Sequence, residues 1–177
     1  MPAPLRRPRR PPPVAPPHPI VLVRAATAAD LDVVLALRMA LLREEAQSPL
    51  FARPRRDAAL LARDLSAQQL ASPTEVTLLA WDGSEPVGLL RCTVSRGTRL
   101  VLPSRYGFLT SAYVVPAYRQ RGVLRALLHV AEQWCRERGL REVRLHCTVE
   151  NATGQEAWER LGYRAAEIVR RRVLARD

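Results

Sequence analysis

Residues 114–140 read VVPAYRQRGVLRALLHVAEQWCRERGL, and this stretch joins the end of a strand to a long helix. The strand must stop at Pro116, because proline has no backbone N–H to donate to a sheet. Apolar residues then recur with helical spacing, which predicts a helix over residues 122–138 that is closed by Gly139. A strand, a short loop and a long helix in this order indicate an α/β domain.

The loop before this helix concentrates positive charge around a single glycine. A helix start presents N–H groups without partners and a partial positive charge. Gly122 lets the backbone come close to a ligand, while Arg119, Arg121 and Arg125 add charged donors. A pyrophosphate would satisfy all of these groups. A single-glycine loop is weak evidence alone, because an arginine cluster that faces water accounts for it about as often.

The segments after the helix continue an alternation of strands and helices. Residues 143–149 alternate between apolar and polar side chains, which predicts a strand. Asn151 can cap a short helix that ends near Leu161. We expect residues 163–174, YRAAEIVRRRVL, to close the fold as a last strand.

The segments before it predict a strand and two helices. Residues 20–26 form a short apolar run that reads as a strand. Thr27 follows as a helix cap, with Asp30 at the position of a capping box. A second helix is predicted over residues 57–71, before the break at Ser-Pro.

The middle of the chain changes to the spacing of strands. Two apolar runs flank the turn signal Asp82-Gly83, which predicts an antiparallel hairpin, and residues 106–115 predict a third strand. The element order is therefore β-αα-βββ-α-β-α-β. It predicts an α/β (α+β) fold with a mixed, mostly antiparallel sheet and helices on both faces.

The composition fits one domain with a tail. We assign residues 20–177 to the domain, because 177 residues are too few for two full-sized domains. Residues 1–19 are rich in proline and arginine and predict a disordered tail. That tail reads as a weak arm for nucleic acid or as a solvated extension. All 28 basic residues are arginines, and outside the tail 24 arginines and 17 acids leave a charge of +7. Such a domain suits phosphates as well as nucleic acid.

The cysteines and the hydropathy pattern point to a reduced compartment. Cys92, Cys135 and Cys147 are odd in number and lack CxxC spacing, so neither a disulfide framework nor a metal site is indicated. We assign them to core packing. No apolar run approaches the length of a membrane span, and no secretory signal is present. We therefore expect a cytoplasmic protein with no membrane partner.

Residues 114–140, together with LHCTVENATGQEAWERLGYR at 145–164, resemble the GNAT superfamily of acyl-CoA-dependent N-acyltransferases. The family's signature is Gln or Arg, two residues, Gly, one residue, then Gly or Ala. It falls here on Arg119, Gly122 and Leu124. The element order of residues 20–172 is similar to that of the family as well.

This resemblance implies a cleft for acetyl-CoA between two splayed parallel strands at the centre of the sheet. Backbone N–H groups of the loop at 119–124 would hold the pyrophosphate, and the strand at 113–115 would pair with the pantetheine arm. Asn151 would contact the CoA side of the cleft. The cofactor contacts assigned in this way are Tyr113, Val114, Val115, Arg119, Gln120, Arg121, Gly122, Val123, Leu124, Arg125, Asn151 and Trp158.

Two positions depart from the family pattern. Leu124 replaces a small residue, so its side chain must point away from the pyrophosphate. Trp158 stands where many members have a tyrosine that protonates the departing thiolate, and an indole is no proton source near neutral pH. Tyr113 or a water could serve instead. Alternatively, the thiolate needs little help and Trp158 is a wall over the pantetheine.

The resemblance implies an N-acetyltransferase that acetylates an amine of a small molecule or protein by direct attack. Candidates for the base that deprotonates the amine are Glu44, Glu45, Glu75 and His146, although each is individually more typical of a solvated or structural group. The alternative is an acyl-CoA-binding regulatory module with little or no turnover. Nucleic acid is an unfavoured partner except through the tail, and a homodimer is one option for the assembly.

Overall fold

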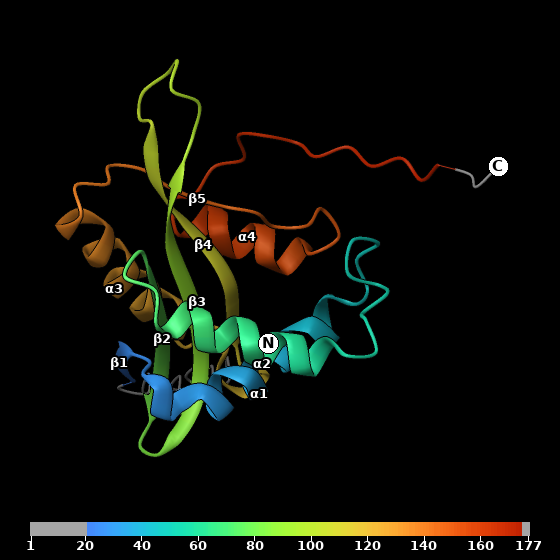
Figure 1. Ribbon diagram of the computed structural model, residues 1–177, viewed down its shortest axis with the longest axis vertical. Helices are drawn as coiled ribbons and strands as arrows, with labels where there is room; N and C mark the ends of the chain where they lie inside the picture. The colour runs from blue at the N-terminus through green and yellow to red at the C-terminus, as the bar shows by residue number, and fades with distance from the viewer. Residues whose placement is uncertain (1–20, 175–177) are drawn as a thin grey trace, which may run out of the picture.

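The computed structural model describes residues 21–174, so the predicted tail at 1–19 lies outside the described residues. Within this range five strands form one sheet in the order β1-β2-β3-β4-β5, as Figure 1 shows. Neighbouring strands are antiparallel except β4 and β5, which are parallel. The strands are β1 Leu22–Ala25, β2 Glu75–Asp82, β3 Glu85–Arg96, β4 Arg105–Val114 and β5 Val143–Leu145.

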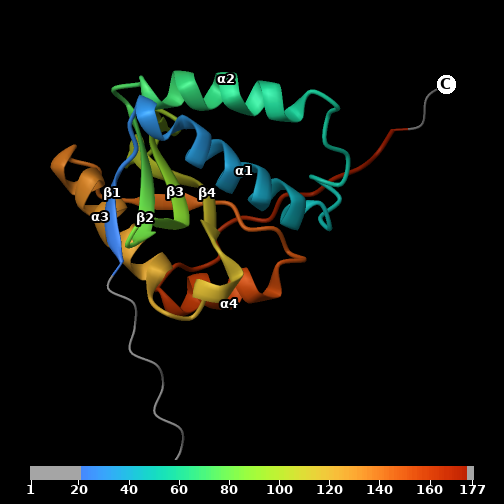
Figure 2. The same ribbon diagram turned by 90° about the horizontal axis from the view of Figure 1, so that it is seen from below.

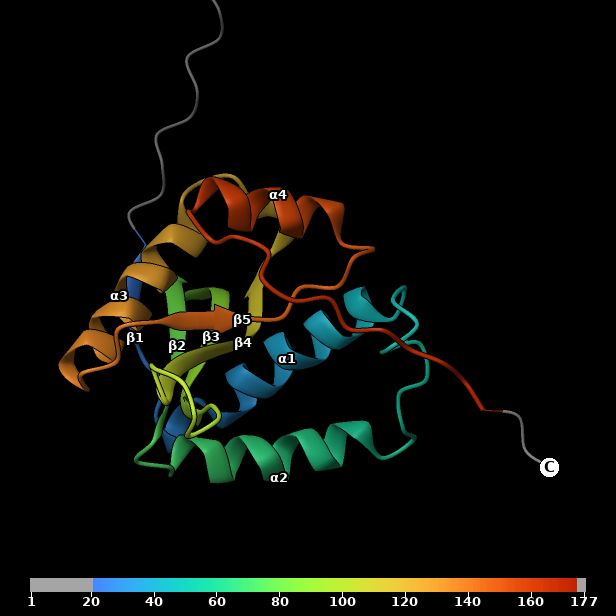
Figure 3. The same cartoon turned by 90° about the horizontal axis from the view of Figure 1, so that it is seen from above.

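Helices cover both faces of this sheet. Helices α1 and α2 lie on one face, and α3 and α4 lie on the other (Figures 2 and 3). Their bounds are α1 Leu31–Glu45, α2 Ala58–Leu70, α3 Val123–Glu137 and α4 Ala152–Arg160. The predicted α/β fold with a mixed, mostly antiparallel sheet is confirmed. The parallel pair is not at the centre of the sheet, as the resemblance implies, but at its β5 edge among residues 21–174, because the predicted last strand does not form there.

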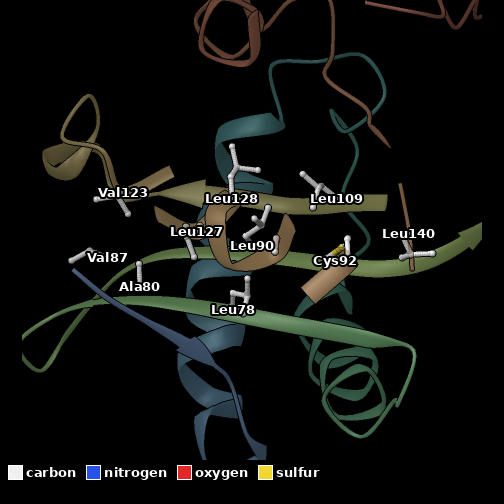
Figure 4. Close-up of a cluster of buried hydrophobic side chains, with 12 residues drawn as sticks. Leu78, Ala80, Val87, Leu90, Cys92, Leu109, Val123, Leu127, Leu128 and Leu140 are labelled. Atoms are coloured by element: carbon white, nitrogen blue, oxygen red, sulfur yellow. The ribbon is translucent and has the colours of Figure 1, made fainter. Parts of the chain in front are cut away.

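The larger core fills the space between the sheet and α3. Leu127 and Leu128 of α3 pack toward Leu90 of β3, as Figure 4 shows. The helix sits close to the strands because Gly88 has no side chain. A Cβ there would lie 3.0 Å from Val123 Cγ1 and 3.1 Å from Leu127 Cδ1. The start of α3 is therefore fixed against the middle of the sheet.

The predicted capping box at the start of the first helix is present. The backbone N–H of Thr27 donates to Asp30 Oδ2 at 2.8 Å, and two guanidinium nitrogens of Arg24 donate to the same carboxylate at 2.7 and 2.8 Å. Arg24, followed by Thr27, holds the pKa of Asp30 well below its usual value, against the opposing effect of burial. These bonds fix where β1 turns into α1.

The predicted closing strand at 163–174 is wrong. These residues carry no regular secondary structure, and the segment runs away from the body after α4 (Figures 1 and 3). Its apolar residues occur in adjacent pairs, Ile168-Val169 and Val173-Leu174, separated by three arginines. They do not alternate with a period of two, so neither side of an extended chain would be uniformly apolar. All four of these apolar side chains are exposed.

Candidate functional site

Strands β4 and β5 pair over only three residues and then separate. Gly107, Phe108 and Leu109 pair with β5, which ends at Leu145. The predicted strand at 143–149 is therefore too long, because β4 leaves its partner and residues 146–149 have no ladder to join. Beyond Leu109, the edge of β4 that is turned away from β3 has no strand partner among residues 21–174. That edge offers backbone hydrogen-bonding groups to an extended ligand.

A β-bulge lies where the two strands separate. Leu89 and Arg91 of β3 pair with Tyr113 and Thr110, so β4 places two residues opposite Leu90. Ser111 has a φ of 52° at this point. A bulge bends its strand and increases the local twist, which accounts for the divergence of β4 from β5.

The basic loop that follows β4 ends in left-handed backbone. Gln120 has a φ of 59° and Gly122 a φ of 84°, and Gly122 caps α3 at its N-terminus. The first N–H groups of α3 have no partners within the helix, and they face this end of the loop. Arg121 and Arg125 are exposed beside them. The loop therefore ends at the first N–H groups of α3, with two exposed arginines beside them.

The leucine that departs from the family signature does not obstruct this loop. Leu124 is half-buried and packs against the core between α3 and the sheet. Val123 is 1% exposed and belongs to that core, so only its backbone is available to a ligand. The first two side chains of α3 therefore pack inward, while Arg125 stays exposed and the first N–H groups remain at the loop.

Arg119 is held by α1 and by the end of β4. Its guanidinium donates to Glu44 Oε2 at 2.6 Å and to the carbonyl oxygen of Val114 at 3.0 Å. The same group lies 5.8 Å from the ring centre of Tyr113. A role for the Arg119 side chain in phosphate binding requires exchange of these bonds. The pair with Glu44 also couples α1 to the loop.

Cys147 lies near both Glu45 of α1 and Trp158 of α4, just beyond the end of β5. Burial, and then the neighbouring charge of Glu44, raises the pKa of Glu45 above its ordinary value. Burial, and then Glu45, raises the pKa of the Cys147 thiol, while a hydrogen bond with Trp158 lowers it. Cys147 was assigned to the core, but the structure places it between α1 and α4. The spacing of residues 143–149 could not reveal this, because the strand stops two residues earlier.

Ser48 and Glu150 add a second link across the same end of the sheet. Ser48 Oγ donates to Glu150 Oε2 at 3.4 Å, which connects the chain after α1 to the chain before α4. Three carboxylates, those of Glu44, Glu45 and Glu150, thus lie at the end of α1 and on the chain before α4 that it contacts. Sequence reasoning named the first two and missed Glu150.

The other predicted site residues have separate environments. His146 is exposed and lies edge-on to Phe108, with ring centres 5.0 Å apart. Glu75 is bound by Arg91 on the α1 and α2 face of the sheet. Asn151 accepts a hydrogen bond from the Gly154 N–H at 2.8 Å and so caps α4.

Tyr113 and Trp158 lie on opposite sides of the sheet. Tyr113 is 9% exposed and packs with Val34 and Leu37 of α1. Trp158 packs against the core on the α3 side and lies edge-on to Tyr163, with ring centres 5.4 Å apart. The hydroxyl of Tyr113 is therefore not located where a tyrosine at position 158 would place its own.

Residues 39–163 match the family model of the acetyltransferase (GNAT) family. Aminoglycoside N(6')-acetyltransferase type 1 of Acinetobacter haemolyticus is 28% identical over 106 residues, 58% of this chain and 71% of that protein. The protein of the same name from Salmonella typhimurium is 34% identical over 62 residues, 35% of this chain and 43% of that protein. The chain thus spans less than half the length of this Salmonella relative.

The fold also matches solved structures over most of their length. A GCN5-related N-acetyltransferase from Ralstonia eutropha superimposes with a TM-score of 0.70 and is 25% identical. The match covers 86% of this chain and 98% of that one. The similarity therefore extends beyond the loop and α3 to the whole arrangement of sheet and helices.

Proposed function

This chain belongs to the acetyltransferase (GNAT) family, and we propose that it transfers an acetyl group from acetyl-CoA directly to an amine. One observation carries the proposal: beyond Leu109, the edge of β4 that no strand within residues 21–174 pairs with leads to a basic loop and the N-terminus of α3. An extended chain with a pyrophosphate at one end fits that path, with backbone groups along it and helix N–H groups at its end.

Both backbone and side-chain groups of the protein would bind acetyl-CoA. Backbone N–H groups of residues 120–124 would hold the pyrophosphate, with Arg121 and Arg125 adding charge. The edge of β4 at Tyr113–Val115 would pair with the pantetheine. Trp158 would cover the arm near the thioester from the α4 side. Leu124 takes no part beyond its backbone, because its side chain packs inward.

Glu45 is the base that we propose for the reaction. The amine nitrogen must lose a proton as it attacks the thioester carbon, after which the C–S bond breaks and the thiolate leaves. A half-buried carboxylate with a raised pKa accepts a proton more readily than an ordinary glutamate. Glu44 is already engaged with Arg119. The departing thiolate would leave with a proton from water or unaided, because neither Trp158 nor buried Tyr113 is a suitable acid.

An aminoglycoside is the acceptor class that we propose. The relatives from Acinetobacter haemolyticus and Salmonella typhimurium are named for acetylation of an aminoglycoside at its 6' nitrogen. Amines of this kind are cationic at neutral pH, and Glu44, Glu45 and Glu150 supply carboxylates at this end of the sheet. The attraction between them is electrostatic and would weaken as salt rises.

A thiol-release assay with acetyl-CoA and a panel of amines tests the activity. We expect turnover with aminoglycosides that carry a free 6' amine, and little with matched compounds in which that position is a hydroxyl. Turnover only with protein or peptide amines would contradict the acceptor. Thermal stabilisation by CoA without transfer to any amine would instead favour a binding module.

A homodimer is the assembly that we propose. Exposed Ile168, Val169, Val173 and Leu174 supply apolar surface on the segment that leaves the body, and β5 pairs only with β4 among the described strands. Sedimentation of the full chain would give twice the monomer mass. Nucleic acid is not expected to bind the domain, and a filter-binding assay at two salt concentrations would detect any contribution of residues 1–19.

A further inference from the structure

The loop between β3 and β4 exposes an apolar tip. Residues 97–104, the hairpin tip, project beyond the helices on both faces of the sheet (Figure 1). Leu100 is 92%, Val101 58% and Leu102 91% exposed. Three consecutive exposed apolar residues cost solubility and favour aggregation, and a protein usually keeps such a run only where it has a use.

Positive charge surrounds this tip. Arg99 lies within it, and Arg96 and Arg105 lie directly opposite one another at its base. Like charges at opposite positions of an antiparallel pair are destabilising. Among residues 21–174 no carboxylate lies within salt-bridge distance of these three arginines. The sequence also contains no Asp or Glu from Pro86 to Ala131.

We propose that the hairpin tip docks onto an anionic lipid surface. The leucines would enter the boundary between headgroups and acyl chains, and lipid phosphates would neutralise Arg96, Arg99 and Arg105. A nucleic acid fits the tip less well, because residues 97–104 contain no aromatic side chain on which bases could stack. This proposal reverses the sequence-based expectation of no membrane partner, which rested on the absence of a long apolar run.

The contact would be peripheral and would leave the transfer site open. No helix within residues 21–174 is long and apolar enough to cross a bilayer. Strand β4 leads from the tip to the basic loop, and its ten residues span roughly 30 Å at the usual rise for a strand. A bilayer at the tip would therefore leave the basic loop and the start of α3 in water.

Cosedimentation of the full chain with vesicles tests the proposal. We expect binding to vesicles of equal phosphatidylglycerol and phosphatidylcholine, weaker binding as salt rises, and little binding to pure phosphatidylcholine. The double variant Leu100→Ser/Leu102→Ser keeps every charge and should lower the vesicle partition coefficient about tenfold or more. The matched variant Leu60→Ser/Leu65→Ser removes exposed leucines from α2 and should bind as the parent does.

Two outcomes would overturn it. Undiminished vesicle binding by Leu100→Ser/Leu102→Ser would show that the charge alone, including the arginines of residues 1–19, carries the attraction. Self-association of the parent chain without vesicles, lost in the same variant, would show that the tip is covered by a second copy. Sedimentation of both proteins in lipid-free buffer distinguishes these outcomes.

Discussion

The loops at the two ends of β4 both carry arginines, but only the loop after β4 leads into a helix that packs against the core. The basic loop at residues 115–122 has left-handed backbone at Gly122 and passes into α3. The hairpin tip at 97–104 has exposed leucines, and Arg99 within it and Arg96 and Arg105 at its base have no carboxylate partner among residues 21–174. The difference is one of fixed geometry. Helix N–H groups held by a packed core define where an anion binds, whereas exposed arginines beside exposed apolar residues suit an extended anionic surface.

Replacement of Glu45 should have the largest effect on turnover, and a replacement at the hairpin tip should have none. A base must be deprotonated to act, so turnover should fall as the pH drops through a pKa above that of an ordinary glutamate. Glu45→Gln should abolish this fall of turnover at low pH and should lower kcat about 10²-fold. Arg99→Gln at the hairpin tip should leave both the pH dependence and kcat unchanged. An unchanged pH profile in Glu45→Gln would mean that another group is the base.

Gly107→Ala should damage the strand that joins the two loops. A Cβ at Gly107 would overlap Cys135 Sγ, so that side chain, α3 or β4 must shift. We expect a loss of about 2–3 kcal/mol in the free energy of unfolding, measured with denaturant. Removing the sulfur with Cys135→Ala makes room, so the double variant should lose less than the two single losses together. If the losses of the two single variants simply add in the double variant, the overlap between residue 107 and Cys135 Sγ does not cause the loss of stability.

Gly122→Ala and Gly97→Ala compare the two loops directly. Alanine at a φ of 84° is strained, and we expect Gly122→Ala to cost about 1–2 kcal/mol of stability and to raise the KM for acetyl-CoA. A Cβ at Gly97 would meet Tyr106 at an ordinary 3.6 Å. Gly97→Ala should therefore change stability by less than about 0.5 kcal/mol and leave KM unchanged. Equal effects of the two variants would remove the distinction between the loops.

Arg121→Gln and Arg99→Gln should show the smallest difference. Arg121 is exposed and lies 5.8 Å from the ring centre of Tyr118, so it contributes charge without a fixed hydrogen bond to the site. We expect the KM for acetyl-CoA to rise roughly threefold in Arg121→Gln, with a shallower dependence on salt. Arg99→Gln should leave KM and its salt dependence unchanged. The opposite ranking would place the cofactor's phosphates near the hairpin tip.

Local patterns predicted most of the elements because each depends on neighbours in sequence. The capping box at Thr27, the turn at Asp82-Gly83 and the apolar face of α3 all involve residues a few positions apart, and all are present. The length of β5 depends instead on where β4 bends. No pattern within residues 143–149 could show that bend.

The sequence could predict where the loop meets α3, but it could not predict the side-chain pairings around that loop. The position of Gly122 at the start of α3 followed from the sequence. The pairing of Arg119 with Glu44 joins residues 75 positions apart, and the approach of Glu45 to Cys147 joins residues 102 positions apart. Such contacts depend on how α1 crosses the end of the sheet, which short-range spacing does not encode.

The bulge at Ser111 inverts the phase of β4. Leu109 belongs to the core on the α3 side, yet Tyr113, four residues later, packs on the α1 side. In a regular strand these two residues would share one side. One extra residue therefore lets a single strand serve two layers in succession. A deletion of Ser111 would leave Tyr113 three positions after Leu109, so regular alternation would keep Tyr113 on the α1 side. The strand would instead lose the bend that separates β4 from β5, so it tolerates a change of side chain better than a change of length.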